Sequence, residues 1–297
     1  MNIGKRMGYM GLSLLAFLAA LVVMLVAQSI VLFPAMILSG IEAGKQGSID
    51  ETAVEQMIID TTNEVAPIAV LVSHLALFLV FALWYRFGCR KPGWKRMDKK
   101  QLLAPKYVLA MVLVGAGMCL FTNFAMVLVY DSIPQAFKET YETMMETSQF
   151  GDNILATIAA VFIAPIGEEL IFRGVAFYYA RKAVSGMSHQ TLGFWIANVV
   201  QAFLFGLLHM NIIQGTYAFL LGLVLGYMVH RYGTILPGIV GHFLFNAIST
   251  FLMDPISSLL PENEVVYSVI AVISVAVVGV GLFLTSKREK MAVLESY

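Results

Sequence analysis

The sequence is poor in charged residues and nearly devoid of cysteine. Only 13% of its 297 residues are charged, whereas 59% are hydrophobic. Soluble domains carry about 25% charged residues, so this composition excludes an ordinary soluble protein. The two cysteines, Cys89 and Cys119, show no metal-site spacing and suggest no disulfide framework. Basic patches with interleaved aromatic residues are also missing, so we expect no nucleic-acid partner.

Long apolar segments take the place of these features. A helix of about 20 apolar residues spans the hydrocarbon core of a bilayer. We therefore predict an all-α fold, a polytopic membrane bundle of about eight transmembrane helices that forms a single integral membrane domain over residues 1–297. The predicted spans are about 8–38, 66–86, 107–130, 153–180, 191–210, 212–230, 235–253 and 265–285.

Charges alternate between the segments that connect these spans. The N-terminus, residues 86–106 and 181–190, the Arg231 turn and the C-terminal tail carry 16 of the 19 basic residues. Residues 39–65, 131–152 and 254–264 carry 14 of the 19 acidic residues. By the positive-inside rule both termini lie in the cytoplasm, and we expect the plasma membrane as location. The first apolar run is too long for a signal peptide, so we interpret it as a retained span.

Three ionisable residues lie deep inside the fourth predicted span, in the stretch GEELIFRG at 167–174. Such groups at membrane depth mark function by default. Glu169 and Arg173 are four residues apart on one helix face and can form an ion pair. Glu168 points about 100° away from Glu169, so its carboxylate is free for acid–base chemistry. We expect Pro165 and Gly167 to kink this helix.

Histidines are the other polar residues in apolar surroundings. His209 ends the stretch FLFGLLH, and His242 lies one turn before Asn246 in HFLFN. An imidazole can handle a proton, and an amide can donate to an oxyanion. His74, in LVSHLALF, is interpreted as a helix-contact residue.

These motifs together resemble a known family. EELIFR, FGLLH and HFLFN match the patterns Glu-Glu-x-x-x-Arg, Phe-x-x-x-His and His-x-x-x-Asn, in that order and on membrane helices. The chain is similar here to the CAAX prenyl protease and bacteriocin-processing (CPBP, Abi) family of intramembrane endopeptidases, which is related to the type II CAAX protease. The resemblance covers residues 150–250, the expected catalytic core.

The resemblance implies peptide hydrolysis in the membrane and assigns a role to each motif residue. The implied roles are a water-activating Glu168, a supporting ion pair of Glu169 and Arg173, a water-orienting or proton-handling His209, and oxyanion stabilisation by His242 and Asn246.

The metal requirement stays open at this point. The family is often labelled metalloendopeptidase, and Glu168, His209 and His242 could hold a zinc ion with water as fourth ligand. The sequence has no His-Glu-x-x-His helix, and Asn246 beside His242 suits an oxyanion better than a metal. We favour activated water with no required cofactor, with zinc as the alternative.

The position of His209 raises a difficulty. With straight spans, Glu168 and His242 come out near the middle of the membrane and His209 near its outer surface. We therefore expect the turn at 210–216 to dip into a water-filled cavity lined by Asn211, Gln214 and Thr216.

The sequence thus favours a membrane hydrolase, a protease that acts on a peptide or membrane-protein substrate within the lipid bilayer. A non-catalytic bacteriocin-immunity-type membrane protein and a proton-coupled transporter are the alternatives. The identity of the substrate and its prenylation, the side to which the cavity opens and the oligomeric state are left open.

Overall fold

The computed structural model describes residues 1–45, 51–89, 98–149 and 151–286. Throughout these ranges the secondary structure is helical and no strand occurs, which confirms the predicted all-α membrane bundle. The helices, with η for π-helical turns, are α1 (Ile3–Lys45), α2 (Glu51–Trp84), η1 (Tyr85–Cys89), α3 (Lys99–Leu102), α4 (Pro105–Tyr130), α5 (Gln135–Ser148), α6 (Ile154–Ile158), η2 (Ala159–Ile163), α7 (Ala164–Glu169), η3 (Leu170–Ala176), α8 (Phe177–Val184), α9 (Gln190–Leu208), α10 (Ile212–Tyr232), α11 (Leu236–Phe251), α12 (Met253–Ser258) and α13 (Glu264–Ser286).

Seven helical segments of the described chain are long and apolar enough to cross a membrane. The predicted span at 235–253 is the exception, because it forms the shorter apolar helix α11, of 16 residues, followed by α12. A helix of that length measures about 24 Å, less than the ~30 Å of a bilayer core. The bundle therefore has seven full-length spans and one short helix packed among them.

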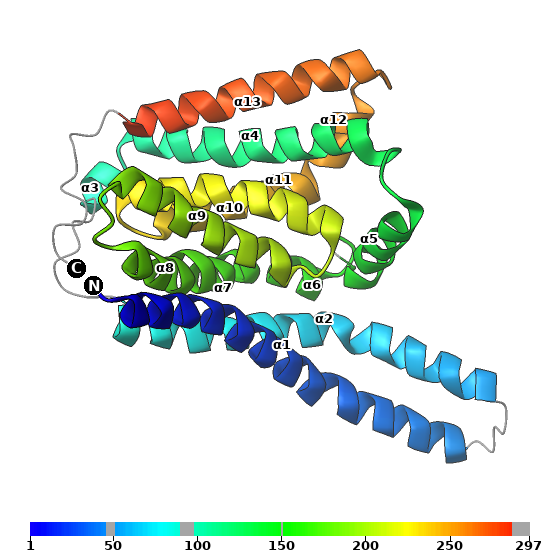
Figure 1. Cartoon of the computed structure of the whole chain (residues 1–297). Coiled ribbons are helices and arrows are strands. Elements are labelled where there is room, and N and C mark those ends of the chain that lie inside the picture. The colour runs from blue at the N-terminus through cyan, green and yellow to red at the C-terminus, as the bar shows by residue number, and fades with distance from the viewer. Residues whose placement is uncertain (46–50, 90–97, 150, 287–297) are drawn as a thin grey trace.

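The first two helices are longer than predicted. Residues 39–45 and 51–65, expected in an outer loop, are helical, and α1 alone has 43 residues. Contacts between the two helices replace lipid there: Thr61 Oγ1 donates to Ser39 Oγ at 3.1 Å, and Ser39 Oγ donates to the Met57 carbonyl at 3.2 Å. A 43-residue helix is about 64 Å long, roughly twice the bilayer core, so this hairpin projects beyond the bundle (Figure 1).

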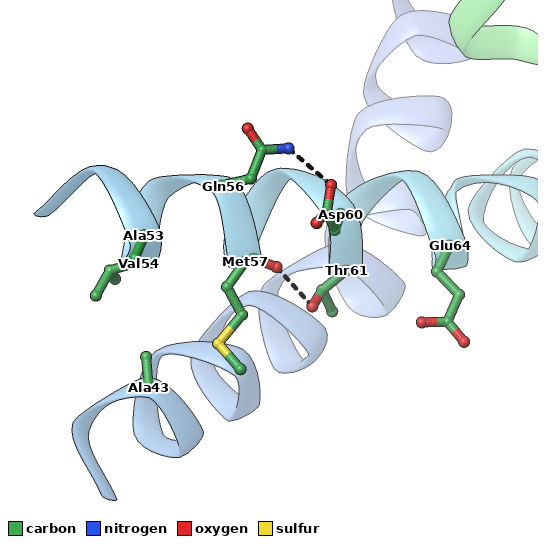
Figure 2. Close-up of a pocket in the computed structure, with 8 residues that line it drawn as sticks. All are labelled: Ala43, Ala53, Val54, Gln56, Met57, Asp60, Thr61 and Glu64. Carbon is green, nitrogen blue, oxygen red and sulfur yellow. Dashed lines mark hydrogen bonds between the residues drawn. The ribbon is translucent and has the colours of Figure 1, made fainter. Parts of the chain in front are cut away.

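The free end of the α1–α2 hairpin carries an open pocket. Figure 2 shows residues that line it: Met57 of α2 extends toward α1, which contributes Ala43, and Gln56 of α2 donates to Asp60. Its volume is about 460 Å³. The acidic pair of the fourth span lies elsewhere in the fold, in the bundle itself, so this pocket is separate from the candidate site (Figure 1).

The segment that runs from Ile154 to Val184 lies inside the bundle. α2 packs against α7, α1 against η3 and α8, and α9 against α8. As a result 61% of the residues in its most apolar stretch are buried, the largest share among the membrane-crossing segments of the described chain. α13 packs on α4 at the edge of the bundle (Figure 1). The charged residues predicted at membrane depth therefore lie in the segment that protein, rather than lipid, surrounds.

Candidate active site

The helix that carries the acidic pair departs from regular α-helical geometry. Two π-helical stretches, η2 and η3, flank the six-residue α7 that ends at Glu169. The chain continues past Pro165 and Gly167 as one helical segment of 31 residues, with π-helical turns on either side, and the kink expected there stays a prediction. π-helical turns are rare and are frequent at functional sites.

Pro165 explains where Asn246 binds. In η2 the Ala164 N–H donates to the Ala159 carbonyl, five residues back. The next donor in this register would be residue 165, but a proline has no N–H, which leaves the Ala160 carbonyl for another donor. Asn246 Nδ2 donates to that carbonyl at 2.9 Å. An amide has two N–H groups, so this bond ties α11 to η2 with one of them.

Glu169 and Arg173 form the ion pair that their four-residue spacing predicts. Arg173 Nη1 lies 2.8 Å from Glu169 Oε1, and neither side chain is exposed. The guanidinium carbon lies 4.3 Å from the centre of the Phe205 ring. On the other side, Gly238 of α11 comes so close that an added Cβ would overlap Glu169 Oε2. The carboxylate is thus fixed between its own helix and α11.

His242 bridges the two glutamates. Its Nδ1 lies 3.3 Å from Glu169 Oε1 and its Nε2 lies 3.7 Å from Glu168 Oε2. An ionised carboxylate paired with Arg173 only accepts hydrogen bonds, so His242 Nδ1 is the donor in this contact. The Nε2 atom of His242 is therefore the one presented to Glu168 and to the space beside it.

A second histidine, His74 of α2, contacts Glu168 from the other side. Its Nε2 lies 3.9 Å from Glu168 Oε1, and the two side chains are 14% and 9% exposed. The sequence interpretation gave His74 only a helix-contact role. No motif includes it, and the signal that could have identified it is a polar side chain deep in an apolar span.

His209 is connected to the site by the Phe205 ring, which contacts both His209 and His242. The histidine is the C-cap of α9 and is half-buried. The Phe205 ring packs edge-on against both His209 and His242, with ring centres 5.3 and 5.5 Å apart. His209 interacts electrostatically with Glu168 and His74 as well. α9 runs obliquely to α4 and α13 (Figure 1), and the ring contacts of Phe205 join the end of α9 to His242.

In the turn after His209, the polar side chains of Asn211 and Thr216 form hydrogen bonds with the first turn of α10. Asn211 caps α10 by accepting from the N–H groups of Ile213 and Gln214 at 2.9 and 3.1 Å. Thr216 Oγ1 donates to the Ile212 carbonyl at 2.7 Å. Asn211 and Thr216 thus have structural partners, and the water-filled cavity expected beside them stays a prediction.

The residues do not form a metal site. In the part of the chain that the structure describes, no three His, Cys, Asp or Glu side chains are grouped so that they could hold an ion. The alternative zinc ligands were Glu168, His209 and His242. As described, these three side chains are not grouped as zinc ligands.

Comparison with known proteins identifies the domain in which these residues lie. Residues 150–248 match the family model of type II CAAX prenyl endopeptidase Rce1-like proteins. The match includes all three sequence motifs and leaves α1 and α2 outside. No curated protein and no solved structure matches the chain. The match confirms the resemblance found in the sequence: about a third of the chain, residues 150–248, is similar to the Rce1-like type II CAAX prenyl endopeptidases, within an integral membrane protein.

Proposed function

We propose that the protein is an intramembrane endopeptidase in which Glu168 activates a water molecule for attack on a peptide bond. One observation carries this proposal: the two oxygens of a carboxylate that is only 7% exposed face the imidazoles of His242 and His74. Arg173 forms its close ion pair with Glu169, and the side chains that pair with Glu168 among the described residues are histidines. A buried carboxylate in this setting is suited to take up a proton.

The neighbours of Glu168 supply the stabilisation that the reaction needs. Glu168, Glu169 and Arg173 together carry a formal charge of −1, which a protonated His242 would balance. Glu169 accepts from His242 Nδ1 in either form of the ring, and in the imidazolium form Nε2 can also donate to a developing oxyanion. The second N–H of Asn246 adds a donor from the same helix face.

The proposed reaction is a balanced hydrolysis. Glu168 takes one proton from water, and the resulting hydroxide oxygen bonds to the carbonyl carbon of the substrate. The electron pair of the C=O double bond moves to oxygen, and His242 and Asn246 stabilise this oxyanion. When the intermediate collapses, the C–N bond breaks and the nitrogen takes the proton from Glu168. The products are a carboxyl terminus and an amine.

His209 is placed for the proton-handling part of this cycle. Its ring lies against Phe205 beside His242, within electrostatic reach of Glu168. We infer that it orients the water before attack or assists the proton transfers that involve Glu168.

The substrate is proposed as a peptide or membrane protein that presents an extended segment within the bilayer. A prenylated peptide and a leader-bearing peptide are both compatible with the site. The alternation of basic and acidic connecting segments supports cytoplasmic termini and a location in the plasma membrane.

A comparison of cleavage products tests this proposal against the two alternatives. Purified wild-type protein and Glu168→Gln would each be incubated with membranes from cells that lack the protein, and new peptide termini would be mapped by mass spectrometry. We expect termini that form only with the wild type. Equal sets of termini from both proteins would refute the proposal and favour an immunity-type or transport role.

A further inference from the structure

The Rce1-like domain does not supply every side chain that contacts Glu168. The match covers residues 150–248, whereas His74 belongs to α2. We propose that His74 is a positioning residue for the reaction, which accepts a hydrogen bond from Glu168 once that carboxylate has taken a proton from water. This inference rests on the proposed function and adds a residue from outside the domain to it.

The hydrogen bonding of His74 fixes which ring atom faces the site. His74 Nδ1 lies 2.8 Å from the carbonyl oxygen of Val70, one turn earlier on α2. A carbonyl oxygen only accepts, so Nδ1 carries the hydrogen in this bond. In a neutral imidazole the other nitrogen then has a free lone pair. That atom, Nε2, is the one that lies 3.9 Å from Glu168 Oε1.

The packing of α2 against α7 holds His74 in this position. An added Cβ at Gly167 would lie 3.7 Å from Leu77 Cβ and 3.8 Å from the His74 carbonyl oxygen. The backbone of α2 at His74 thus lies beside the residue that precedes Glu168. The bond to the Val70 carbonyl orients the imidazole, and the packing of α2 on α7 sets its distance from Glu168.

The interaction between His74 Nε2 and Glu168 becomes favourable during the reaction. Before proton transfer, the lone pair of His74 Nε2 faces an ionised Glu168, and two acceptors do not attract each other. After Glu168 has taken the proton of water, its O–H can donate to that lone pair. The interaction is therefore stronger once the proton has moved than before, and only interactions of that kind raise kcat. His74 should then affect kcat much more than KM.

Two substitutions separate this role from a helix-packing role. An asparagine amide reproduces the Nδ1 position of histidine, so His74→Asn keeps a partner for the Val70 carbonyl and loses the contact with Glu168. A glutamine amide reproduces the Nε2 position, so His74→Gln keeps an acceptor near Glu168 and loses the Val70 contact. A packing role predicts that Asn is the better substitute, and the positioning role predicts Gln.

The experiment measures kcat, KM and the unfolding temperature of the detergent-purified full chain. The probe is a fluorogenic peptide built on a cleavage site identified with the wild-type protein. We expect His74→Asn to lower kcat about 100-fold with KM changed less than about twofold, and His74→Gln to stay within about tenfold of the wild type. Ser73→Ala is the control, because Ser73 Oγ donates to the same Val70 carbonyl at 2.8 Å without contact to Glu168.

Each outcome has a defined meaning. A loss of kcat in both His74 variants at an unchanged unfolding temperature also supports the contact. Two results would overturn the role of His74: a wild-type kcat in His74→Asn, or a loss of kcat that accompanies a lowered unfolding temperature. In either case the proposed function stands if Glu168→Gln is inactive. A wild-type protein that produces no termini at all would overturn the proposed function, and this inference with it.

Discussion

Two membrane-crossing segments of this protein are both long and apolar but have opposite surroundings. α13 buries only 22% of its most apolar stretch, whereas the segment Ile154–Val184 buries 61%. α13 packs on α4 and leaves large apolar side chains such as Val272 exposed, at 70%. The central segment instead places Glu168, Glu169 and Arg173 among other helices.

The difference shows what makes ionisable groups tolerable at membrane depth. On α13 a charge would face hydrocarbon and cost several kcal/mol. In the central segment each charge meets a partner from the protein: Arg173 for Glu169, and two imidazoles for Glu168. Apolar composition therefore identifies both segments as membrane helices, and the pattern of partners separates the functional one from the lipid-facing one.

The largest effect is expected from breaking the buried pair. Glu169→Ala leaves Arg173 without its carboxylate in a site with no exposure, and loss of one partner of such a pair costs about 3–5 kcal/mol. We expect a marked fall in expression and unfolding temperature, measured by thermal unfolding in detergent. Val272→Ala on α13 is the control and should leave the unfolding temperature within a few degrees of the wild type. Equal stability of both variants would contradict the comparison.

Asn246 should affect the chemistry more than the fold. Asn246→Ala removes the bond to the Ala160 carbonyl, which is worth about 1 kcal/mol, and a proposed oxyanion donor, which is worth about 100-fold to 1,000-fold in kcat. Peptide-cleavage kinetics beside thermal unfolding separate the two contributions. A variant that unfolds earlier but turns over at the wild-type rate would limit Asn246 to holding α11 against η2.

Two glycine substitutions compare the packing around Glu169 with the packing on α13. Gly238→Ala on α11 would push a methyl group onto the Glu169 carboxylate and lower stability by about 1–3 kcal/mol. On α13, a Cβ at Gly279 meets nothing within 4 Å, so Gly279→Ala should be neutral or slightly stabilising. Thermal unfolding of the two variants, measured side by side, gives the answer. A neutral Gly238→Ala would mean that Glu169 is less tightly confined than described.

The smallest effect is expected from metal removal. Incubation with a strong chelator followed by desalting should leave the cleavage rate unchanged, because the proposed base is Glu168 and the oxyanion donors are side chains. Loss of activity that zinc restores would contradict this mechanism and return Glu168, His209 and His242 to the role of ligands.

Local spacing in the sequence predicted much of the site. The i,i+4 relation identified the Glu169–Arg173 pair, and the rotation of Glu168 away from it anticipated that Glu168 would face other helices. His242 and Asn246 come from one helix face as their spacing predicts. Each of these relations depends on one helix alone, which is why sequence suffices for them.

Other features depend on contacts between helices that are far apart in sequence. His74 lies 94 positions before Glu168, and the packing of α2 against α7 brings the two together. The π-helical turns and the bond from Asn246 to the Ala160 carbonyl follow from packing around Pro165. The lengths of α1 and α2 were underestimated because helix–helix contacts, rather than lipid, maintain their polar ends.

The most direct test of the account is the turnover of Glu168→Gln. Glutamine keeps the shape of the side chain and removes its ability to take a proton, so the variant should unfold at nearly the wild-type temperature and cleave the identified peptide about 100-fold to 10,000-fold more slowly. A folded Glu168→Gln protein that cleaves at the wild-type rate would contradict the central role of this carboxylate.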